Sequence, residues 1–119
     1  MINEIATVAV VVSDAKKSKE WFRDKLGFEV KDDVDHWIVV APHGSTTGIH
    51  LCEAKELEPG NQGILFYADD VDKTCEEMKR KAVVFTRPLG KAEWDESTRY
   101  AMFKDLDGNE YWLMPKIHR

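Results

Sequence analysis

Cysteine is scarce in this chain, with only Cys52 and Cys75 among 119 residues. Two thiols without the spacing of a zinc finger cannot build a disulfide framework, so we expect both to be reduced. Long apolar runs are also lacking, since none approaches the roughly 20 residues that span a bilayer. The N-terminus has no basic region followed by an apolar segment and a cleavage site, which argues against an export signal. The sequence therefore predicts a cytoplasmic protein with no membrane segment.

A basic surface is lacking as well, because 17 Lys and Arg residues face 22 Asp and Glu and give a net charge of −5. A nucleic-acid partner requires a cluster of cations that neutralises phosphates. The one basic run, residues 79–81, lies at the end of a predicted helix, where cations complement the helix dipole. We therefore expect no nucleic-acid partner. The composition, 43% hydrophobic and 33% charged, is instead typical of a folded globular domain.

The first half of the chain has the pattern of a strand, a helix and three further strands. Residues 5–12 form a β-branched apolar run, which favours a strand. Asp14 suits a helix N-cap, and Gly27 suits the position that ends a helix. Between them apolar residues recur at helical spacing. The three strands that follow are predicted over residues 28–31, 37–41 and 47–53.

The second half has the same pattern after a predicted linker over residues 55–62, which has no apolar period and contains a Pro-Gly pair. A strand over residues 63–68 leads to a second helix. Asp70 caps this helix, and its apolar stripe is predicted to end at Ala82. The next strand is predicted over residues 83–86 and is ended by an Arg-Pro pair.

A polar loop that holds Trp94 leads to a closing hairpin with strands over residues 99–104 and 109–114. The turn DLDGN between them favours a tight reversal, because Asp and Asn bond their own backbone and Gly accepts positive φ. Side chains alternate after the turn, so Tyr111 and Trp112 must lie on opposite faces. One face packs on a core and the other is free to line a site.

The two halves superpose at a separation of 56 residues, which places Asp14 on Asp70 and Phe22 on Met78. Such a repeat, occurring twice, indicates a duplicated βαβββ module rather than a solenoid. We therefore predict an α+β fold in which two βαβββ modules form a curved mixed sheet around a central cavity, with the helices on the convex side. The single domain is predicted over residues 1–119, with module one at 1–54, the linker at 55–62 and module two at 63–115.

Alternation along the strands assigns a set of side chains to the inner face of this sheet. Most are apolar, and a few are polar or aromatic. This is the composition of a small-molecule pocket, in which apolar walls carry a few convergent polar groups. The distinctive residues of the predicted cavity are Thr7, His50, Cys52, Tyr67, Glu110 and Trp112.

Structural roles compete with this interpretation. A lone histidine on a strand, such as His50, is more often a hydrogen-bonded structural imidazole than a ligand or a base. Glu110 beside a turn is usually solvated, and Tyr67 and Trp112 could be core aromatics. The sequence has no Ser/His/Asp arrangement, phosphate-binding glycine loop or HExxH motif. The residues alone therefore indicate a pocket but no reaction.

Three patterns occur in order along residues 4–115: DxxxSxxWFxxxLGF at 14–28, the repeated βαβββ module, and FxDxDGN at 103–109. Together they resemble the vicinal oxygen chelate superfamily, which contains glyoxalase I, bleomycin-resistance proteins and extradiol dioxygenases. Enzymes of that superfamily typically bind a divalent metal through one inward residue from the first and fourth strands of each module. The matching positions here are Thr7, His50, Gly63 and Trp112.

Of these four positions only His50 offers a good metal ligand, whereas a catalytic metal site needs about three. The resemblance therefore implies a protein without a metal or another cofactor, similar to the bleomycin-resistance-like group of small acidic dimers that sequester a ligand. We expect a homodimer, which also covers exposed sheet edges. Its partner is expected to be a small organic molecule. Trp112, Tyr67 and Trp94 would form the walls of the pocket, and His50 and Glu110 would orient the ligand.

An enzyme is the alternative. Glu110 or Cys52 could join His50 in a rearranged metal site, which would make the chain a metal-dependent lyase or dioxygenase of the same superfamily. A metal-free enzyme would instead use His50 as a general base, and His50 is the one candidate catalytic residue.

Overall fold

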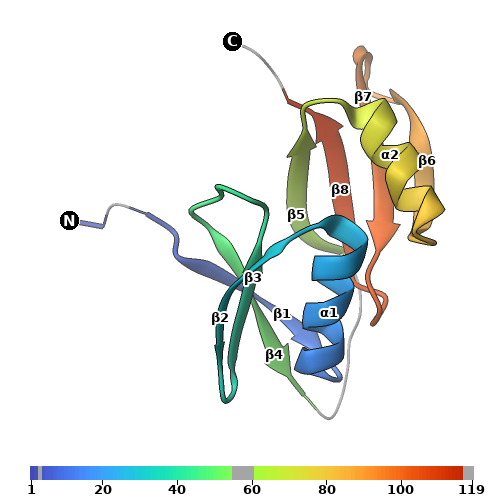
Figure 1. Cartoon of the computed structure of the whole chain (residues 1–119). Coiled ribbons are helices and arrows are strands. Elements are labelled where there is room, and N and C mark those ends of the chain that lie inside the picture. Colours follow the sequence, from blue (N-terminus) through green and yellow to red (C-terminus); the bar gives the residue numbers. More distant parts are fainter. Residues whose placement is uncertain (3, 55–60, 117–119) are drawn as a thin grey trace. The chain divides into compact units, whose positions relative to one another are not determined.

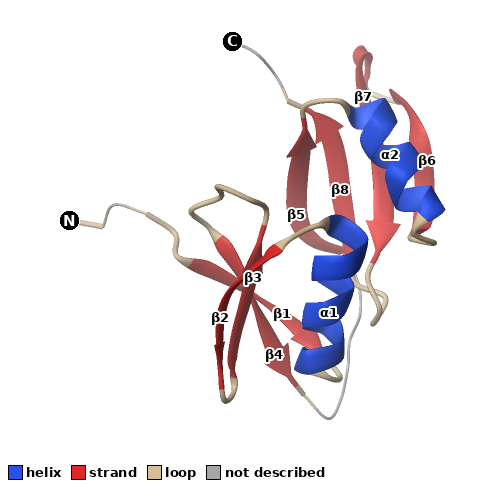
Figure 2. Ribbon diagram, in the orientation of Figure 1, coloured by secondary structure: helices blue, strands red, loops and turns tan. Residues whose placement is uncertain are grey.

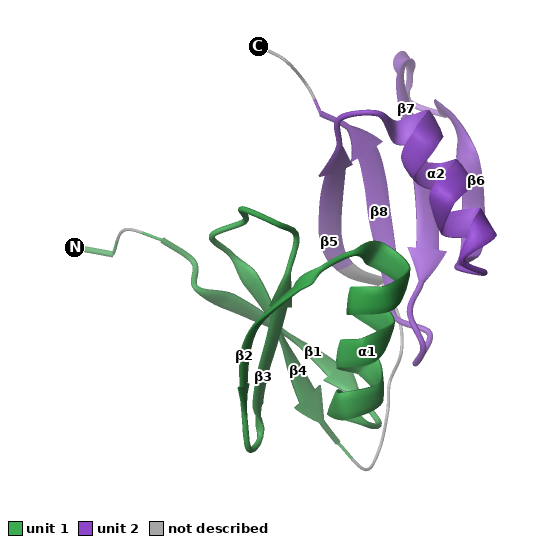
Figure 3. Ribbon diagram, viewed as in Figure 1, with its two compact units in different colours: residues 1–59 green, residues 60–119 purple. Residues whose placement is uncertain are grey.

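The computed structural model describes residues 1–2, 4–54 and 61–116, and the chain divides into two compact units, residues 1–59 and 60–119 (Figure 3). These units are called the first and second modules below, and each follows the order βαβββ (Figure 1). The first contains β1 (Thr7–Val12), α1 (Ala15–Leu26), β2 (Glu29–Val34), β3 (Trp37–Ala41) and β4 (Gly48–Glu53). The second contains β5 (Asn61–Ala68), α2 (Val71–Arg80), β6 (Val84–Ala92), β7 (Asp95–Lys104) and β8 (Glu110–Pro115).

Each module folds its strands into one mixed sheet with a helix packed against it (Figure 2). The strand order is β1-β4-β3-β2 in the first sheet and β5-β8-β7-β6 in the second. The pairs β1–β4 and β5–β8 are parallel, and the other neighbours are antiparallel. The predicted α+β class with two βαβββ modules is confirmed, and the eight described strands form two four-stranded sheets.

Helix α1 begins and ends at the predicted residues. The Asp14 carboxylate accepts hydrogen bonds from the backbone N–H groups of Lys16 and Lys17, each at 3.1 Å, and so satisfies donors that the first turn leaves unpaired. Gly27 ends the helix with φ 71°, the left-handed conformation that glycine adopts without steric cost. Phe22 on the inner face is fully buried. No helix in the described part of the chain is long and apolar enough to cross a membrane.

Helix α2 also begins at its predicted cap, since the Asp70 carboxylate accepts the Lys73 N–H at 3.1 Å. Its end differs from the prediction. The helix stops two residues before Ala82, which has φ 62° and is exposed, so the apolar stripe does not reach this residue. The backbone N–H of Val83 instead bonds to the carbonyl of Met78 at 3.0 Å, and Val83 is the residue that becomes buried. The helical spacing of apolar residues reaches Ala82 in the sequence, but the backbone leaves the helix after Arg80.

Strands β2, β5, β6 and β7 extend by two or more residues beyond their predicted bounds, and β7 begins at Asp95 rather than at residue 99. β2 continues to Val34 across a bulge in its pairing with β3. β6 runs through the Arg-Pro pair to Ala92, so the predicted polar loop is wrong and the segment is a long hairpin. Proline lacks the N–H that a central strand needs, but β6 is an edge strand, where proline is tolerated. β5 begins at Asn61, inside the predicted linker, and residues 55–60 of that linker lie outside the described residues.

The closing hairpin is confirmed, with β7 and β8 paired antiparallel across the predicted turn. Asp105 in that turn is 5% exposed. Its carboxylate accepts hydrogen bonds from the N–H groups of Asp107 and Asn109, at 2.9 and 3.0 Å, and from the Tyr111 hydroxyl at 2.8 Å. Tyr111 is fully buried on the core face of β8, so Trp112 lies on the opposite face.

Candidate functional site

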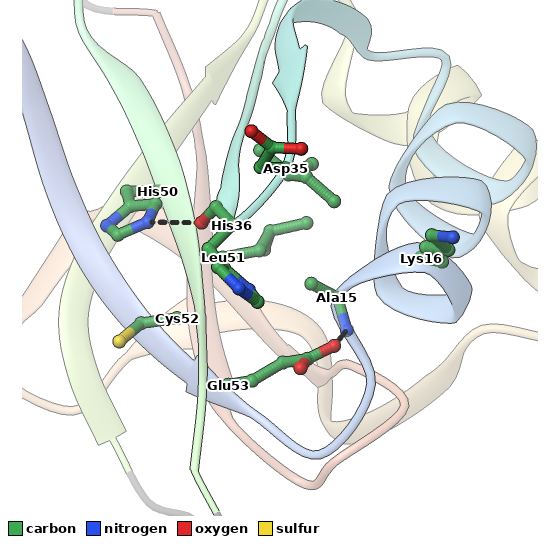
Figure 4. A pocket seen from close by; sticks show the side chains of 9 residues that line it. Ala15, Lys16, Asp35, His36, His50, Leu51, Cys52 and Glu53 are labelled. Atoms are coloured by element: carbon green, nitrogen blue, oxygen red, sulfur yellow. Dashed lines mark hydrogen bonds between the residues drawn. The ribbon is translucent and has the colours of Figure 1, made fainter.

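The first module carries a pocket of about 640 Å³ (Figure 4). It lies among the start of α1, the β2–β3 turn and strand β4. This volume falls within the roughly 300–1,000 Å³ that is usual for small-molecule sites. Two of the residues predicted to line a site, His50 and Cys52, contribute to its wall. The ionisable residues of the pocket are Lys16, Asp35, His36, His50, Cys52 and Glu53.

Local contacts fix the polar groups of this pocket. Glu53 Oε1 accepts the Ala15 N–H at 2.8 Å, which satisfies a donor at the start of α1 (Figure 4). The His50 Nε2 atom lies 3.5 Å from the His36 carbonyl oxygen. The His50 imidazole also stacks on Trp37, with ring centroids 4.2 Å apart and planes tilted by 33°. His50 is therefore held as a structural imidazole would be, while its ring still borders the pocket.

Thr7 is not brought to His50. In the parallel pairing of β1 with β4, Thr7 lies opposite Gly48, and Ala9 lies opposite His50. Thr7 is therefore two residues away along the strand, a displacement of about 6–7 Å.

The four positions that the resemblance marks as metal ligands do not fit a divalent ion. Thr7 is displaced from His50, and Trp112 offers only an N–H donor. Gly63 has no side chain and has φ 72°, within an irregular stretch of the β5–β8 pairing. Across residues 1–2, 4–54 and 61–116, no three His, Cys, Asp or Glu side chains are grouped so that they could hold a metal ion. These residues therefore support no metal-dependent step.

The second module carries a cluster of three stacked aromatic rings, Trp94, Tyr100 and Trp112, which is called the aromatic cluster. The rings of Tyr100 and Trp112 are 4.7 Å apart and tilted by 20°. The Trp94 ring lies 5.1 Å from Tyr100 and 6.3 Å from Trp112. Tyr100 is only 6% exposed, whereas Trp94 is 61% exposed. The cluster therefore has a buried base and an open edge.

Charged groups surround the Tyr100 ring. The Arg87 Cζ atom lies 3.7 Å from the ring centroid, a cation–π contact. The Glu93 carboxylate accepts the Tyr100 hydroxyl at 3.2 Å and Arg87 Nη2 at 3.1 Å. Its own backbone N–H, together with the hydrogen bonds from Arg87 and Tyr100, holds the pKa of Glu93 below its usual value. Burial raises the pKa of Tyr100, so its hydroxyl stays protonated and donates to an ionised Glu93.

Strand β5 adds further apolar side chains to the face that carries Trp112. Leu65 pairs with Trp112 and Tyr67 pairs with Met114, so these side chains share one face of the sheet. Leu65 is 42% exposed and Tyr67 is 56% exposed. Glu110 lies on the same face, where its carboxylate accepts the Thr86 hydroxyl at 3.0 Å. Of the residues predicted from the sequence, this face of the second sheet holds Tyr67, Trp94, Glu110 and Trp112.

Tyr100 and Arg87 are among the residues of this site that were not predicted from the sequence. Tyr100 could have been found, because it lies two residues before Met102, and Met102 pairs with Trp112. Alternation along the predicted strand therefore places Tyr100 on the face of Trp112. The role of Arg87 could not be predicted, because its hydrogen-bond partners are brought to it by the β6–β7 hairpin, which the sequence pattern does not show.

Two βαβββ modules, one with a ligand-sized pocket and the other with an exposed aromatic face, define a protein of the glyoxalase-like class. The family model of the Glyoxalase/Bleomycin resistance protein/Dioxygenase superfamily matches residues 4–113, and the chain belongs to this superfamily. A relative from Bacillus subtilis (strain 168), the uncharacterized protein YetH, is 33% identical over 95% of this chain and 98% of its own length.

Solved structures share the fold along nearly the whole chain. TnmS3, an antibiotic binding protein from Streptomyces sp. CB03234, is 31% identical and superposes with a TM-score of 0.84, covering 98% of both chains. A member of the superfamily from Sphaerobacter thermophilus DSM 20745 is 26% identical, with a TM-score of 0.85 over 97% of this chain and 98% of its own. The resemblance stated from the sequence motifs is thus confirmed.

Proposed function

We propose that this protein binds a small, flat organic molecule on the exposed face of the second sheet, without a metal. The observation that carries the proposal is the aromatic cluster, whose rings stack on the sheet face opposite Tyr111, with Tyr100 buried beneath the exposed Trp94. Contiguous exposed apolar side chains on a soluble domain mark binding surfaces. Trp94, Tyr67 and Leu65 supply such a surface beside Trp112.

The chemistry of this face favours a ligand with a planar ring. Aromatic pairs in offset or tilted stacks contribute about 0.5–1.5 kcal/mol beyond the area that they bury. Trp94 is 61% exposed and so lies at the open edge of the cluster, where a further ring can stack. Glu110 lies on the same face, and Glu93 adjoins the cluster, so the ligand can also carry donors or a positive charge.

One structural relative and the residues at the usual metal positions both favour ligand binding over catalysis. TnmS3, which is 31% identical over 98% of this chain, is described as an antibiotic binding protein, and so we extend ligand binding of that kind to this chain. The residues at the usual metal positions lack the donors that metal-dependent lyases and dioxygenases need.

Trp112→Ala is expected to weaken the binding of an aromatic ligand by about 10-fold, because it removes the ring between Tyr100 and Leu65. Thermal-shift screening of a metabolite and antibiotic library would first identify a ligand, and isothermal titration calorimetry would then compare its affinity for the variants. Trp21→Ala is the matched control, because Trp21 is also half-buried but lies on α1, edge-on to Phe22. If Trp112→Ala and Tyr67→Ala both leave the affinity unchanged, the proposed face is not the binding site.

Purified protein is expected to hold no stoichiometric Zn, Ni, Fe or Mn, because one good ligand cannot retain a divalent ion against water and buffer. Elemental analysis measures the metal content directly. Incubation with a chelator is expected to leave both the melting temperature and ligand affinity unchanged. A metal content near one equivalent per chain would contradict the proposal and favour a metal-dependent enzyme that uses His50.

A further inference from the structure

The turn that carries Trp94 lacks the backbone preference of a tight hairpin. Ala92 pairs with Asp95, so Glu93 and Trp94 form a two-residue turn between β6 and β7. Such turns favour glycine or asparagine, because one or both central residues adopt positive φ. Neither Glu93 nor Trp94 has positive φ. The turn therefore lacks the positive-φ backbone that usually fixes a two-residue hairpin.

The pairing of β6 with β7 that leads to this turn is irregular. Its register shifts at three places, between Phe85 and Arg87, between Arg87 and Gly90, and between Lys91 and Ala92. Each shift interrupts the ladder of backbone hydrogen bonds. Trp94 is 61% exposed, so core packing does not hold it in place.

The Arg87 side chain donates hydrogen bonds to backbone carbonyls of both β6 and β7, where the pairing of these strands is irregular. Its Nη1 atom donates to the Tyr100 carbonyl at 2.7 Å and to the Pro88 carbonyl at 3.2 Å. Its Nη2 atom donates to the Lys91 carbonyl at 2.8 Å and to Glu93 Oε1 at 3.1 Å. One planar guanidinium thus joins β7 to the irregular end of β6 and to the turn itself.

The same guanidinium contacts the base of the aromatic cluster. Its Cζ atom lies 3.7 Å from the centroid of Tyr100, the ring on which Trp94 stacks. The Arg87 side chain is only 21% exposed and its bond to the Tyr100 carbonyl is partly buried, whereas its bonds to Lys91 and Glu93 lie at the surface. A single side chain therefore contacts the turn, through Glu93 and the preceding Lys91 carbonyl, and also the ring beneath Trp94.

We propose that Arg87 is a positioning residue for ligand binding, which holds the β6–β7 turn so that Trp94 is already stacked on Tyr100 before a ligand arrives. A turn ordered in advance does not have to be ordered on binding, and affinity improves accordingly. Lysine cannot replace this residue, because a single ammonium group lacks the planar fork that reaches several acceptors at once. The effect on binding rests on the proposed function, whereas the effect on the turn does not.

Hydrogen–deuterium exchange with mass spectrometry tests the effect on the turn without any ligand. In Arg87→Lys, amides of residues 89–94 are expected to exchange about 10-fold faster than in the wild type, because local opening becomes easier. Arg99→Lys is the matched control. Arg99 lies on β7 of the same hairpin but pairs with Asp72, at 3.2 and 2.8 Å, and its loss is expected to change exchange at 89–94 less than twofold. Unchanged exchange in Arg87→Lys would overturn the proposal.

A second, milder variant, Glu93→Gln, keeps the test possible if Arg87→Lys does not fold. Glu93→Gln removes one charged partner of Arg87 from the exposed turn and is expected to raise exchange at residues 89–94 about threefold. Exchange over residues 105–113 is expected to stay at the wild-type rate in each folded variant. A rise there as large as at the turn would show general destabilisation and would contradict a local positioning role.

Titration calorimetry with proflavine, a flat aromatic cation, tests the effect on binding. Arg87→Lys and Trp94→Ala are each expected to weaken binding about 10-fold, and the double variant is expected to lose no more than either alone, since both changes act through one ring. Additive losses, about 100-fold in the double variant, would overturn the positioning role.

Faster exchange in Arg87→Lys with no proflavine binding by the wild type would support the role of Arg87 in holding the turn but count against the proposed ligand class. Proflavine binding that depends on Trp112, with unchanged exchange, would support the proposed function and reject the role of Arg87.

Discussion

Asp105→Ala is expected to lower the free energy of unfolding by about 3–5 kcal/mol, because it removes the acceptor at the centre of a buried hydrogen-bond network. The carboxylate accepts four hydrogen bonds, from the backbone N–H groups of Asp107 and Asn109, the Asn109 side chain and the Tyr111 hydroxyl, at 2.8–3.1 Å. Asp105 is 5% exposed, so water cannot readily replace the lost acceptor. The turn that it holds also sets the pairing of β8, and with it the face to which Trp112 points.

Urea denaturation followed by circular dichroism measures this loss. Asp95→Ala is the matched control, because Asp95 also accepts three local hydrogen bonds, from the Ser97 N–H and hydroxyl and from the Thr98 hydroxyl, but is exposed. Its removal is expected to cost about 0.5 kcal/mol or less. A loss in Asp105→Ala no larger than that of the control would mean that the network does not stabilise the hairpin.

Features that depend on residues close in sequence were predictable. The Asp105 turn, the caps Asp14 and Asp70 and the end of α1 at Gly27 all rest on bonds within about four residues. The 56-residue repeat then predicted the fold of two modules, because residues at equivalent positions, such as Asp14 and Asp70, were expected to have the same structural role in each half. Alternation along β8 assigned Trp112 to the non-core face for the same reason.

Features that depend on strand order, on register or on the local backbone conformation were not predictable. The β6–β7 hairpin was missed because a proline, here Pro88, usually ends a strand. Proline is tolerated on an edge strand, but only the strand order shows that β6 is one. Thr7 and His50 were both assigned to the inward face as matching ligand positions, but the parallel register of β1 and β4 offsets them by two residues. Ala82 continued a helical spacing, yet its φ of 62° ends the apolar stripe. The contacts of Arg87 follow from the same missed hairpin.

Tyr111 makes the stability of the second module sensitive to alkaline pH. Burial, and then the neighbouring Asp105 carboxylate, raise the pKa of Tyr111 well above its ordinary value of about 10. The folded protein therefore keeps the hydroxyl proton at a pH where the unfolded chain releases it. The stabilisation is fully present below pH about 10 and is lost as the pH rises further, by about 1.4 kcal/mol per pH unit for this group.

Tyr111→Phe isolates this contribution. At pH 7 the variant is expected to be about 1–2 kcal/mol less stable than the wild type, because it lacks the 2.8 Å hydrogen bond to Asp105. Between pH 10 and 11.5 the wild type loses about 2 kcal/mol that the variant cannot lose, so the two unfolding free energies are expected to converge. Urea denaturation at half-unit pH steps measures both curves. Tyr67→Phe is the control, since this ring is 56% exposed and its difference from the wild type is expected to stay constant. A Tyr111→Phe difference that does not narrow above pH 10 would show that the folded state does not retain this proton more tightly than the unfolded chain.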